Sequence, residues 1–280
     1  MIVHRRAIAA LAAVLLIALA PGARAKRARA AEAAVDVDVD LTDGPGPALA
    51  TYRLRGSALT KVVRRGDGAP VGVWRATLAA IDPLPGALAK LADGAPGPAP
   101  AVDTPAAAIT LRRAAGARRV TMARPPTDGE AARTLSALDT PRAMPLVTLE
   151  FAVLPWGGAK ETDGARPVTV RLTAHGSAGA EVRVHSSDLA LQMAEVHAAQ
   201  PGVTPLPPEW IAVSEPAPGA AIRVVKVGST IDVPLRAPIP AAGAFAVRAA
   251  LAGTATFHAR GFDEQIVIDT SSPPLSAPPR

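Results

Sequence analysis

Cysteine is absent from all 280 residues of the chain. Disulfides, cysteine-ligated zinc, iron–sulfur clusters and thiol catalysis are therefore excluded, and so is a lipid-modified N-terminal cysteine. Aromatic residues make up only 3% of the chain, and alanine supplies much of the 49% that is hydrophobic. Because an alanine side chain buries little apolar surface, the core must rest on Val, Leu and Ile.

The chain has only a modest excess of positive charge. Thirty basic residues, 25 of them arginine, stand against 24 acidic residues and give a net charge of +6. Removal of the first 25 residues would take Arg5, Arg6 and Arg24 and leave about +3. So small an excess does not call for nucleic acid or an anionic membrane as the partner.

The first 25 residues have the parts of a secretory signal peptide. Residues 4–6 are basic, residues 7–20 are apolar, and Pro21-Gly22 precedes the small-residue pattern Ala23-Arg24-Ala25. The apolar run has 14 residues, whereas a membrane-spanning helix needs about 20. We therefore predict cleavage and export to a bacterial periplasm or the medium, with no transmembrane span left in the mature chain.

The exact processing stays open. Lys26, Arg27 and Arg29 follow the predicted site at once, and positive charge there opposes translocation. Cleavage after Ala30 would remove these three residues, and retention of the segment as an anchor is the other alternative. Arg5-Arg6 also resembles the start of a twin-arginine signal, but the next residues continue that motif poorly, which favours a Sec-type route.

A strictly alternating segment begins the mature part. In residues 35–41, Val or Leu alternates with Asp, which is the period of a half-buried strand with its carboxylates on one face. Three like charges on one face need a basic partner strand, and residues 51–55 supply one across a Gly/Pro turn. We predict a hairpin with Asp40 opposite Arg53 and Asp38 opposite Arg55, because this register serves both faces.

The same aspartates, Asp36, Asp38 and Asp40, imitate the first, third and fifth positions of an EF-hand calcium loop. That loop needs Gly at its sixth position and Glu at its twelfth, and here those positions hold Leu41 and Pro47. Calcium is therefore the weaker interpretation, and we predict no metal and no cofactor.

Two helices and a second hairpin are predicted next. From Trp74 the apolar spacing becomes helical, with a break at Asp82-Pro83 and a helix that ends at Asp93-Gly94. Residues 109–112 and 119–122 predict a hairpin that turns near Ala115-Gly116. A second helix would begin near residues 127–130 and stop before Pro141. The order hairpin, helix, hairpin, helix predicts an α+β domain over residues 34–142.

The second half lacks helical spacing. A strand-like run at residues 149–153 is followed by alternating runs at residues 168–174, 181–185, 221–227, 230–235, 244–251 and 265–269. Six or more such runs predict an antiparallel sandwich over residues 146–270. Pro234 should lie on an edge strand, where its missing N–H does no harm. Residues 271–280 are rich in Pro and Ser and are expected to form a disordered tail.

Part of this half is similar to known domains. Residues 227–233, Pro238-Ile239-Pro240 and residues 243–249 resemble the last strands of bacterial extracytoplasmic immunoglobulin-like domains, where a Gly-x-aromatic-x-apolar strand follows alternating Thr and aliphatic residues. The pattern is also similar to the sandwich of BsuPI-type proteinase inhibitors, and the resemblance covers residues 165–270. The resemblance implies an all-β immunoglobulin-like sandwich for this half. With the α+β N-terminal domain that the residue patterns predict, the expected fold class is an α+β domain followed by that sandwich.

Motifs of common enzymes are missing. There is no G-x-S-x-G, and the neighbours His185 and Ser186-Ser187-Asp188 cannot form a catalytic triad among themselves. There is also no P-loop, no G-x-G-x-x-G after a strand and no carboxylate pair with the spacing of a glycosidase. These absences favour binding over catalysis, and an uncharacterised hydrolase is the last alternative.

Three histidines, His175, His185 and His197, fall in one region and raise the question of zinc. If Leu172 pairs with Val184, His175 and His185 lie roughly 13 Å apart along the strands. Zinc needs nitrogen ligands at about 2 Å, so these two could not share an ion. Solvent-facing histidines are the better interpretation.

The strongest candidate site is the tip of the second hairpin, which carries Arg112, Arg113, Arg118 and Arg119. A guanidinium group binds a phosphate or carboxylate through two parallel hydrogen bonds. Charged hairpin tips also serve solubility, and the Arg-rich composition is typical of a GC-rich genome, so that alternative stays open. The cluster predicts an anionic or protein partner.

We therefore expect an exported envelope protein that acts by binding a protein or an anionic polymer and is not an enzyme. In the alternative, the chain inhibits a secreted protease by placing residues 156–164 or 200–209 in its active site. Proline-rich loops lose little entropy on binding, which suits that role, but they are also ordinary sandwich connections.

Overall fold

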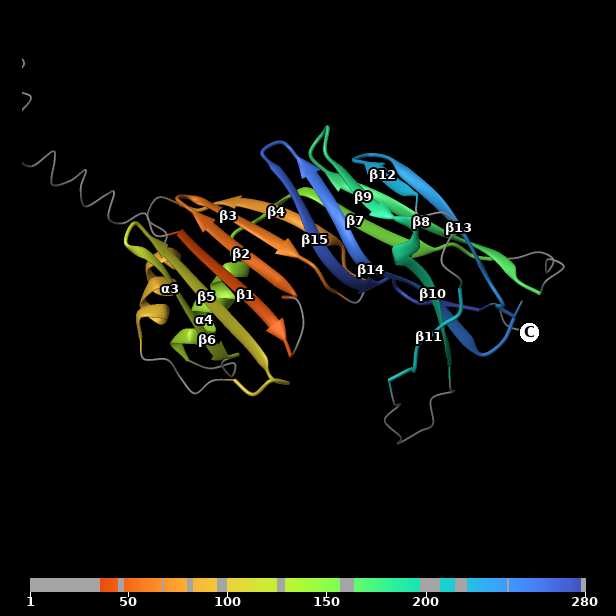
Figure 1. The fold of residues 1–280 in the computed structure, drawn as a ribbon, viewed down its shortest axis with the longest axis horizontal. Coiled ribbons are helices and arrows are strands. Elements are labelled where there is room, and N and C mark those ends of the chain that lie inside the picture. The colour runs from red at the N-terminus through yellow and green to blue at the C-terminus, as the bar shows by residue number, and fades with distance from the viewer. Residues whose placement is uncertain are drawn as a thin grey trace, which may run out of the picture.

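The structure is a computed structural model, and it describes residues 36–44, 48–66, 68–79, 83–94, 100–124, 129–156, 164–196, 207–214, 221–240 and 242–277. The predicted signal peptide lies outside these residues. The described chain is mostly β, with 59% in strands and 11% helical, and its strands form two antiparallel sheets (Figure 1). The sandwich character predicted from the sequence is confirmed.

Sheet A has nine strands in the order β13-β8-β7-β4-β3-β2-β1-β5-β6. From the N-terminus their bounds are β1 Asp36–Asp43, β2 Ala50–Arg55, β3 Ala58–Val63, β4 Val71–Thr77, β5 Pro105–Arg113, β6 Gly116–Ala123, β7 Met144–Val153, β8 Arg166–Gly176 and β13 Thr230–Ala237. Pro234 lies in β13, an end strand of this sheet, as predicted. The sheet runs without interruption across the boundary that the sequence suggested at residues 142–146, because β4 pairs with β7.

Sheet B has seven strands and is built around the long strand β14, Phe245–Ala259. The others are β9 Glu181–His185, β10 Leu189–Glu195, β11 Ile211–Ala212, β12 Ile222–Lys226, β15 Phe262–Ser271 and β16 Leu275–Ser276. β9 and β10 pair with one edge of β14, and β15 and β16 with the other.

Two α-helices lie in the first half (Figure 1). α3 spans Leu84–Asp93 and starts after Pro83, as the sequence predicted, and its buried residues Leu84, Leu88 and Ala92 recur every four positions on one side. α4 spans Glu130–Ser136 and continues as a 3-10 turn, η1, over Ala137–Asp139. Both helices bury their apolar side against sheet A.

Sheet A is covered on opposite faces in its two halves. Val37 and Val39 of β1 point to the side of α3 and α4, where they join one apolar core. Val71 and Val73 of β4 point to the other side and join a second core with sheet B. Because side chains alternate along a strand, β3 and β4 contribute to both cores and connect them.

β4 corrects one prediction. Helical spacing was expected from Trp74 onward, but Trp74 to Thr77 completes a strand that began at Val71. The strand form prevails because β4 pairs on both sides, with β3 and with β7, and both of its faces enter a core. Gly72, at φ +149°, is the close point of this pairing, since a Cβ there would stand 2.3 Å from the carbonyl oxygen of Val147.

The register of the first hairpin is shifted by two residues from the predicted one. Asp38 stands opposite Arg53, and Asp40 opposite Thr51. The predicted contact between Asp38 and Arg55 still forms, diagonally, with 2.6 Å between Oδ1 and Nη2. Both registers place the same residues on the same faces, so burial does not separate them.

The tail after residue 270 is also ordered as far as residue 277. β16 pairs Leu275 with Val247, and the Ser272 N–H donates to the Ala249 carbonyl at 2.8 Å. The prediction of a disordered tail was wrong for these residues, because the Pro/Ser composition hid a short strand that extends sheet B. Residues 278–280 lie outside the described part.

Candidate binding surface

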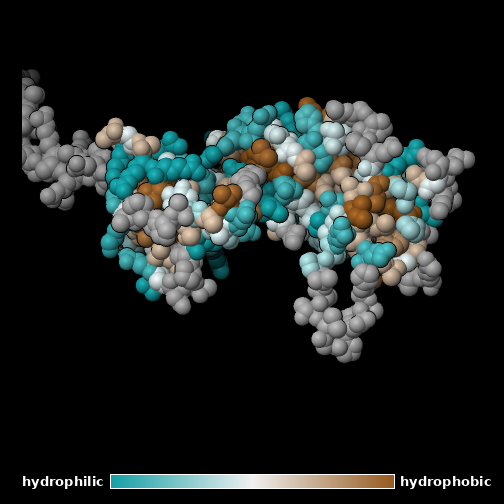
Figure 2. All heavy atoms as spheres, turned by 60° about the horizontal axis from the view of Figure 1, so that its bottom comes forward, coloured by the Kyte–Doolittle hydropathy of each residue, from teal (hydrophilic) through white to brown (hydrophobic). Residues whose placement is uncertain are grey.

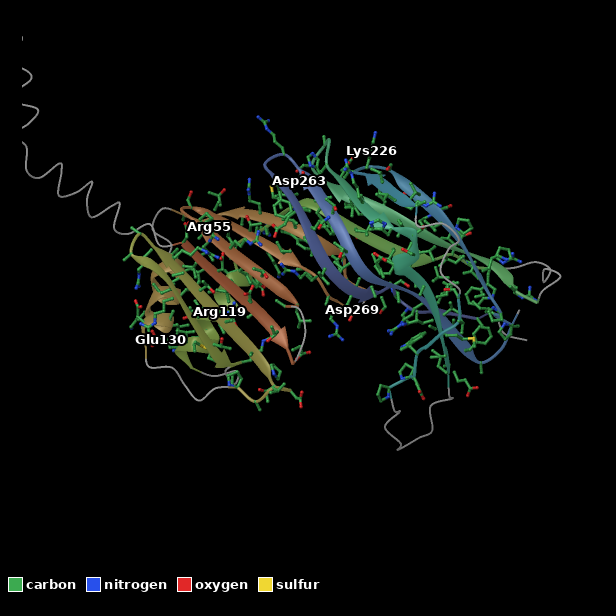
Figure 3. All side chains as sticks on the ribbon, viewed as in Figure 1. Arg55, Arg119, Glu130, Lys226, Asp263 and Asp269 are labelled. Atoms are coloured by element: carbon green, nitrogen blue, oxygen red, sulfur yellow. The ribbon has the colours of Figure 1, made fainter. Side chains whose placement is uncertain are left out.

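One face of sheet A lies at the surface where β2, β1, β5 and β6 run side by side (Figure 3). The alternation that buries Val37 and Val39 on the helix side sends the charged residues to the other side. We call this surface the open face. It is formed by Asp36, Asp38, Asp40, Arg53, Arg55, Arg112 and Arg119.

The open face is a ladder of carboxylates between two rows of guanidinium groups. Asp38 is the centre, because its two oxygens contact Arg55 Nη2 at 2.6 Å and Arg112 Nε at 3.1 Å. Arg119 Nη2 is 3.7 Å from Asp40 Oδ2. The repulsion between the aspartates of β1, which the sequence predicts, is thus compensated by arginines on both sides of β1. Figure 2 shows hydrophilic side chains with apolar patches between them on this N-terminal part.

The four arginines of the predicted cluster lie on the β5–β6 hairpin, which turns where the sequence predicted, but they do not lie together. Arg112 and Arg119 are on the open face, 56% and 63% exposed. Arg113 and Arg118 are on the helix side, where both contact Asp93 at the end of α3, at 2.5 and 3.5 Å. The sequence held the signal for this division, because neighbouring residues of a strand point to opposite faces.

Asp93 is a neighbour of the arginine cluster that the sequence did not identify. The hydrogen bond from Arg113 lowers the pKa of its carboxyl group, and the charges of Arg113 and Arg118 act in the same direction. The pair on the helix side is therefore an ion pair at neutral pH.

Beside β2 the open face meets sheet B. Arg53 donates two hydrogen bonds, at 2.6 and 2.8 Å, to the carboxylate of Glu264 on β15. The hydrogen bond from Arg53 lowers the pKa of Glu264. Nearby, Arg64 donates to Thr51 Oγ1 at 2.5 Å, and burial, followed by the charge of Arg53, lowers the pKa of Arg64. This polar network joins two segments 211 residues apart in the sequence.

The histidines and serines take separate places. Leu172 and Val184 lie in different sheets and are buried in the same core, so the predicted pairing between them was wrong. His175 contacts Glu150 at 3.4 Å, whereas His185 stands opposite Ile222. Alternating apolar residues are typical both of adjacent strands and of strands that face each other, so the pattern did not separate the two.

Ser186, Ser187 and Asp188 form a 3-10 turn, η2. Ser186 is fully buried, and Asp188 accepts a hydrogen bond from the Thr254 N–H at 3.3 Å. Within the described ranges, no group of three or more His, Asp or Glu side chains could hold a metal ion. His197 lies outside those ranges.

The first of the two suggested inhibitory segments begins in the core. The Trp156 ring stacks on Phe245 with 6.1 Å between centroids, and its Nε1 donates to the Pro240 carbonyl at 3.4 Å. Trp156 therefore anchors the sandwich. Residues 157–163 and 200–206 lie outside the described part, and residues 207–209 are exposed.

A groove of about 500 Å³ separates α3 from α4. Its lining includes the apolar residues Leu78, Leu84 and Ala87 and the charged residues Glu130 and Arg133. Its size is within the range of small-molecule pockets.

Among the described residues, no helix has both the length and the apolar character to cross a membrane. A scan against models of known protein families finds no match to this chain, and a search of the curated proteins finds none either.

Proposed function

We propose that this chain is an exported binding protein of a bacterial envelope, that it acts without catalysis, and that the open face at Arg112 and Arg119 contacts an acidic partner protein or an anionic polymer. In this proposal, residues 34–142 form the α+β part that carries the surface. Residues 146–270 form an immunoglobulin-like sandwich that supports it.

The observation that supports the proposal is the way in which the guanidinium groups share their carboxylates. Arg55 and Arg112 both contact Asp38, so this one carboxylate compensates two cations. Arg119 is 3.7 Å from Asp40, beyond good hydrogen-bond distance, and is more than half exposed. Both arginines therefore keep donors for an incoming anion.

The two arginines of the open face are accessible from solvent. The two guanidinium groups are 56% and 63% exposed, whereas Asp38 and Asp40 are only 13% and 26% exposed, so a ligand carboxylate or phosphate would bind Arg112 and Arg119 from the solvent side beside these aspartates. Asp38 would keep its shorter contact with Arg55 while such a ligand is bound. Binding of this kind weakens as salt rises, because the surface charges are screened.

The test is capture of partners by the full-length tagged protein in its native envelope, with cross-linking and mass spectrometry. Arg112→Glu with Arg119→Glu should abolish a salt-sensitive set of partners while circular dichroism stays unchanged. Arg171→Glu is the matched control, since Arg171 is also an exposed arginine on sheet A, paired with Asp232 in its far half.

Partners that survive the double reversal would contradict the role of the open face. Stoichiometric recovery of one protease would favour the alternative of an inhibitor, and turnover of esters or glycosides by the purified protein would contradict the non-catalytic part. Sequencing of the mature N-terminus in the same sample tests export, because cleavage after Ala25 or Ala30 is expected.

A further inference from the structure

β6 is an end strand of sheet A, on the side away from sheet B (Figure 1). One of its edges pairs with β5, and among the described residues no strand pairs with the other. An end strand of this kind presents a row of backbone N–H and C=O groups that another extended chain can use. β6 is eight residues long, Gly116–Ala123, and contains no proline.

The opposite end of the sheet differs. β13 carries Pro234, which has no N–H to donate, and this makes β13 a poor template for a further strand. Of the two ends, β6 is therefore the one at which sheet A is able to grow.

The side chains of β6 determine what kind of strand would fit. Arg119 points to the open face, and its neighbour Arg118 points to the helix side, 49% exposed. Their carboxylate contacts, to Asp40 and Asp93, are 3.7 and 3.5 Å long, so neither arginine makes a short hydrogen bond there. β6 thus carries one weakly held guanidinium group on each side of the sheet.

We propose that β6 accepts an extended segment of an acidic partner protein as a tenth strand of sheet A, with two consecutive carboxylates of that segment opposite Arg118 and Arg119. Consecutive residues of an added strand point to opposite faces, so each carboxylate meets one arginine. This proposal rests on the proposed binding function and adds the backbone edge and the pattern of the partner.

A second copy of the chain is a poorer occupant. Pairing of β6 with β6 would bring Arg118 and Arg119 of both copies onto two adjacent strands, and like charges across strands are unfavourable. Charged residues on an end strand also keep other strands away. If Arg118 and Arg119 only keep other strands away, no strand should bind to β6. If β6 accepts a partner, acidic strands should bind selectively.

The probe is a blocked eight-residue peptide of alternating Thr and Val with two glutamates at its centre. Its control has two glutamines in their place. Each exposed arginine–carboxylate pair is expected to favour the acidic peptide about 1.4- to 5-fold, so the two pairs together should favour it about 2- to 25-fold. The preference should shrink as salt rises.

Amide hydrogen exchange locates the bound peptide. Strand addition should slow exchange at alternate residues of β6, because every second N–H points to the free edge and becomes bonded. The absence of cysteine provides a second measurement. A single thiol introduced as Thr121→Cys should form a disulfide with a peptide cysteine at one position, and neighbouring positions should react less.

Charge exchange separates recognition from loss of fold. Arg118→Glu with Arg119→Glu should reverse the preference, so that a peptide with two central lysines binds better than the acidic one. Arg75→Glu, an exposed arginine on β4 of the same sheet, is the matched control and should leave the acidic preference unchanged.

Three results would overturn the proposal. One is binding of the acidic peptide without slowed exchange in β6, which would move the ligand to the side chains and leave the proposed function intact. The second is no preference for the acidic peptide, and the third is a wild-type protein that forms a dimer through β6. Failure of the envelope capture described above would instead count against the proposed function itself.

Discussion

Replacement of Glu264 by glutamine removes the carboxylate that joins β15 to the open face. Arg53 donates to both of its oxygens at 2.6 and 2.8 Å, and the two side chains are 32% and 34% exposed. Hydrogen bonds to charged groups contribute about 1.5 to 3 kcal/mol, and exposed pairs about 0 to 1. For a bidentate pair at one-third exposure, we expect a coupling of about 1 kcal/mol.

The two single replacements should differ. Glu264→Gln leaves Arg53 beside Arg64, whose pKa is already lowered by burial and by the charge of Arg53. Arg53→Gln removes that repulsion together with the ion pair. Loss of the carboxylate should therefore lower the free energy of unfolding more than loss of the guanidinium group does.

The effect also has a defined pH dependence. The hydrogen bond from Arg53 lowers the pKa of Glu264 in the folded state. Its stabilising contribution is therefore complete above the pKa of an unfolded Glu, about 4.3, and is lost as pH falls through the lower folded value. The wild-type protein and Glu264→Gln should converge in stability on acidification.

Urea unfolding of the wild-type protein, both single variants and the double variant gives the coupling as a thermodynamic cycle. A coupling below about 0.3 kcal/mol at pH 7, near the limit of additivity, would refute the reasoning. So would a difference between wild type and Glu264→Gln that stays constant to pH 3. High salt should reduce the coupling only in part, because the pair is two-thirds buried.

Two further predictions concern the parts that hold this surface in place. Gly72→Ala should lower the free energy of unfolding by about 3 kcal/mol in urea titrations, since its Cβ would stand 2.3 Å from the Val147 oxygen at a φ of +149°; a neutral substitution would mean that β4 and β7 separate easily. Tyr52→Phe should cost about 1 kcal/mol at pH 7 by removal of the 2.8 Å bond to Asp139. Burial and then this bond raise the pKa of Tyr52 in the folded state. The stabilising contribution of the neutral hydroxyl is therefore complete below the pKa of an unfolded tyrosine, about 10, and is lost as pH rises through the higher folded value. The Tyr52 and Phe proteins should converge in alkali, and parallel stability curves would contradict this.

Local patterns predicted much of the secondary structure. Aspartate alternation placed β1 and both of its faces correctly, and leucine spacing placed α3 after the break at Pro83. The Ala115-Gly116 signal placed the turn of the β5–β6 hairpin. Each of these three predictions depends on residues close together in the sequence, because hydrophobic periodicity and turn-forming residues determine local structure.

Long-range pairing was not visible in the same way. β1 lies between β2 and β5, and the pairing with β5 brings Asp38 to Arg112 across 74 residues. Nothing in the alternation of β1 identifies that second neighbour. The register of the first hairpin failed for a related reason, since a shift of two residues preserves both faces and leaves only diagonal contacts to distinguish the alternatives.

The candidate site was predicted in composition but not in arrangement. Arg112 and Arg119 lie at the surface, but the division of the four arginines between two faces, and the role of Asp93 at the end of α3, depend on how α3 packs beneath the hairpin. Glu264 comes from sheet B and has no signal near Arg53 in the sequence.

The uninterrupted sheet A also sets the order in which this chain is able to fold. β4 gains its second neighbour only when β7 has been made, so a chain that stops at residue 142 ends with an open edge and with Val71 and Val73 stripped of their core. Pairings between segments distant in the sequence form slowly, and a strand edge that is still unpaired is prone to aggregation. The first half is therefore completed by the second, and the edge of β4 stays open until β7 has been made.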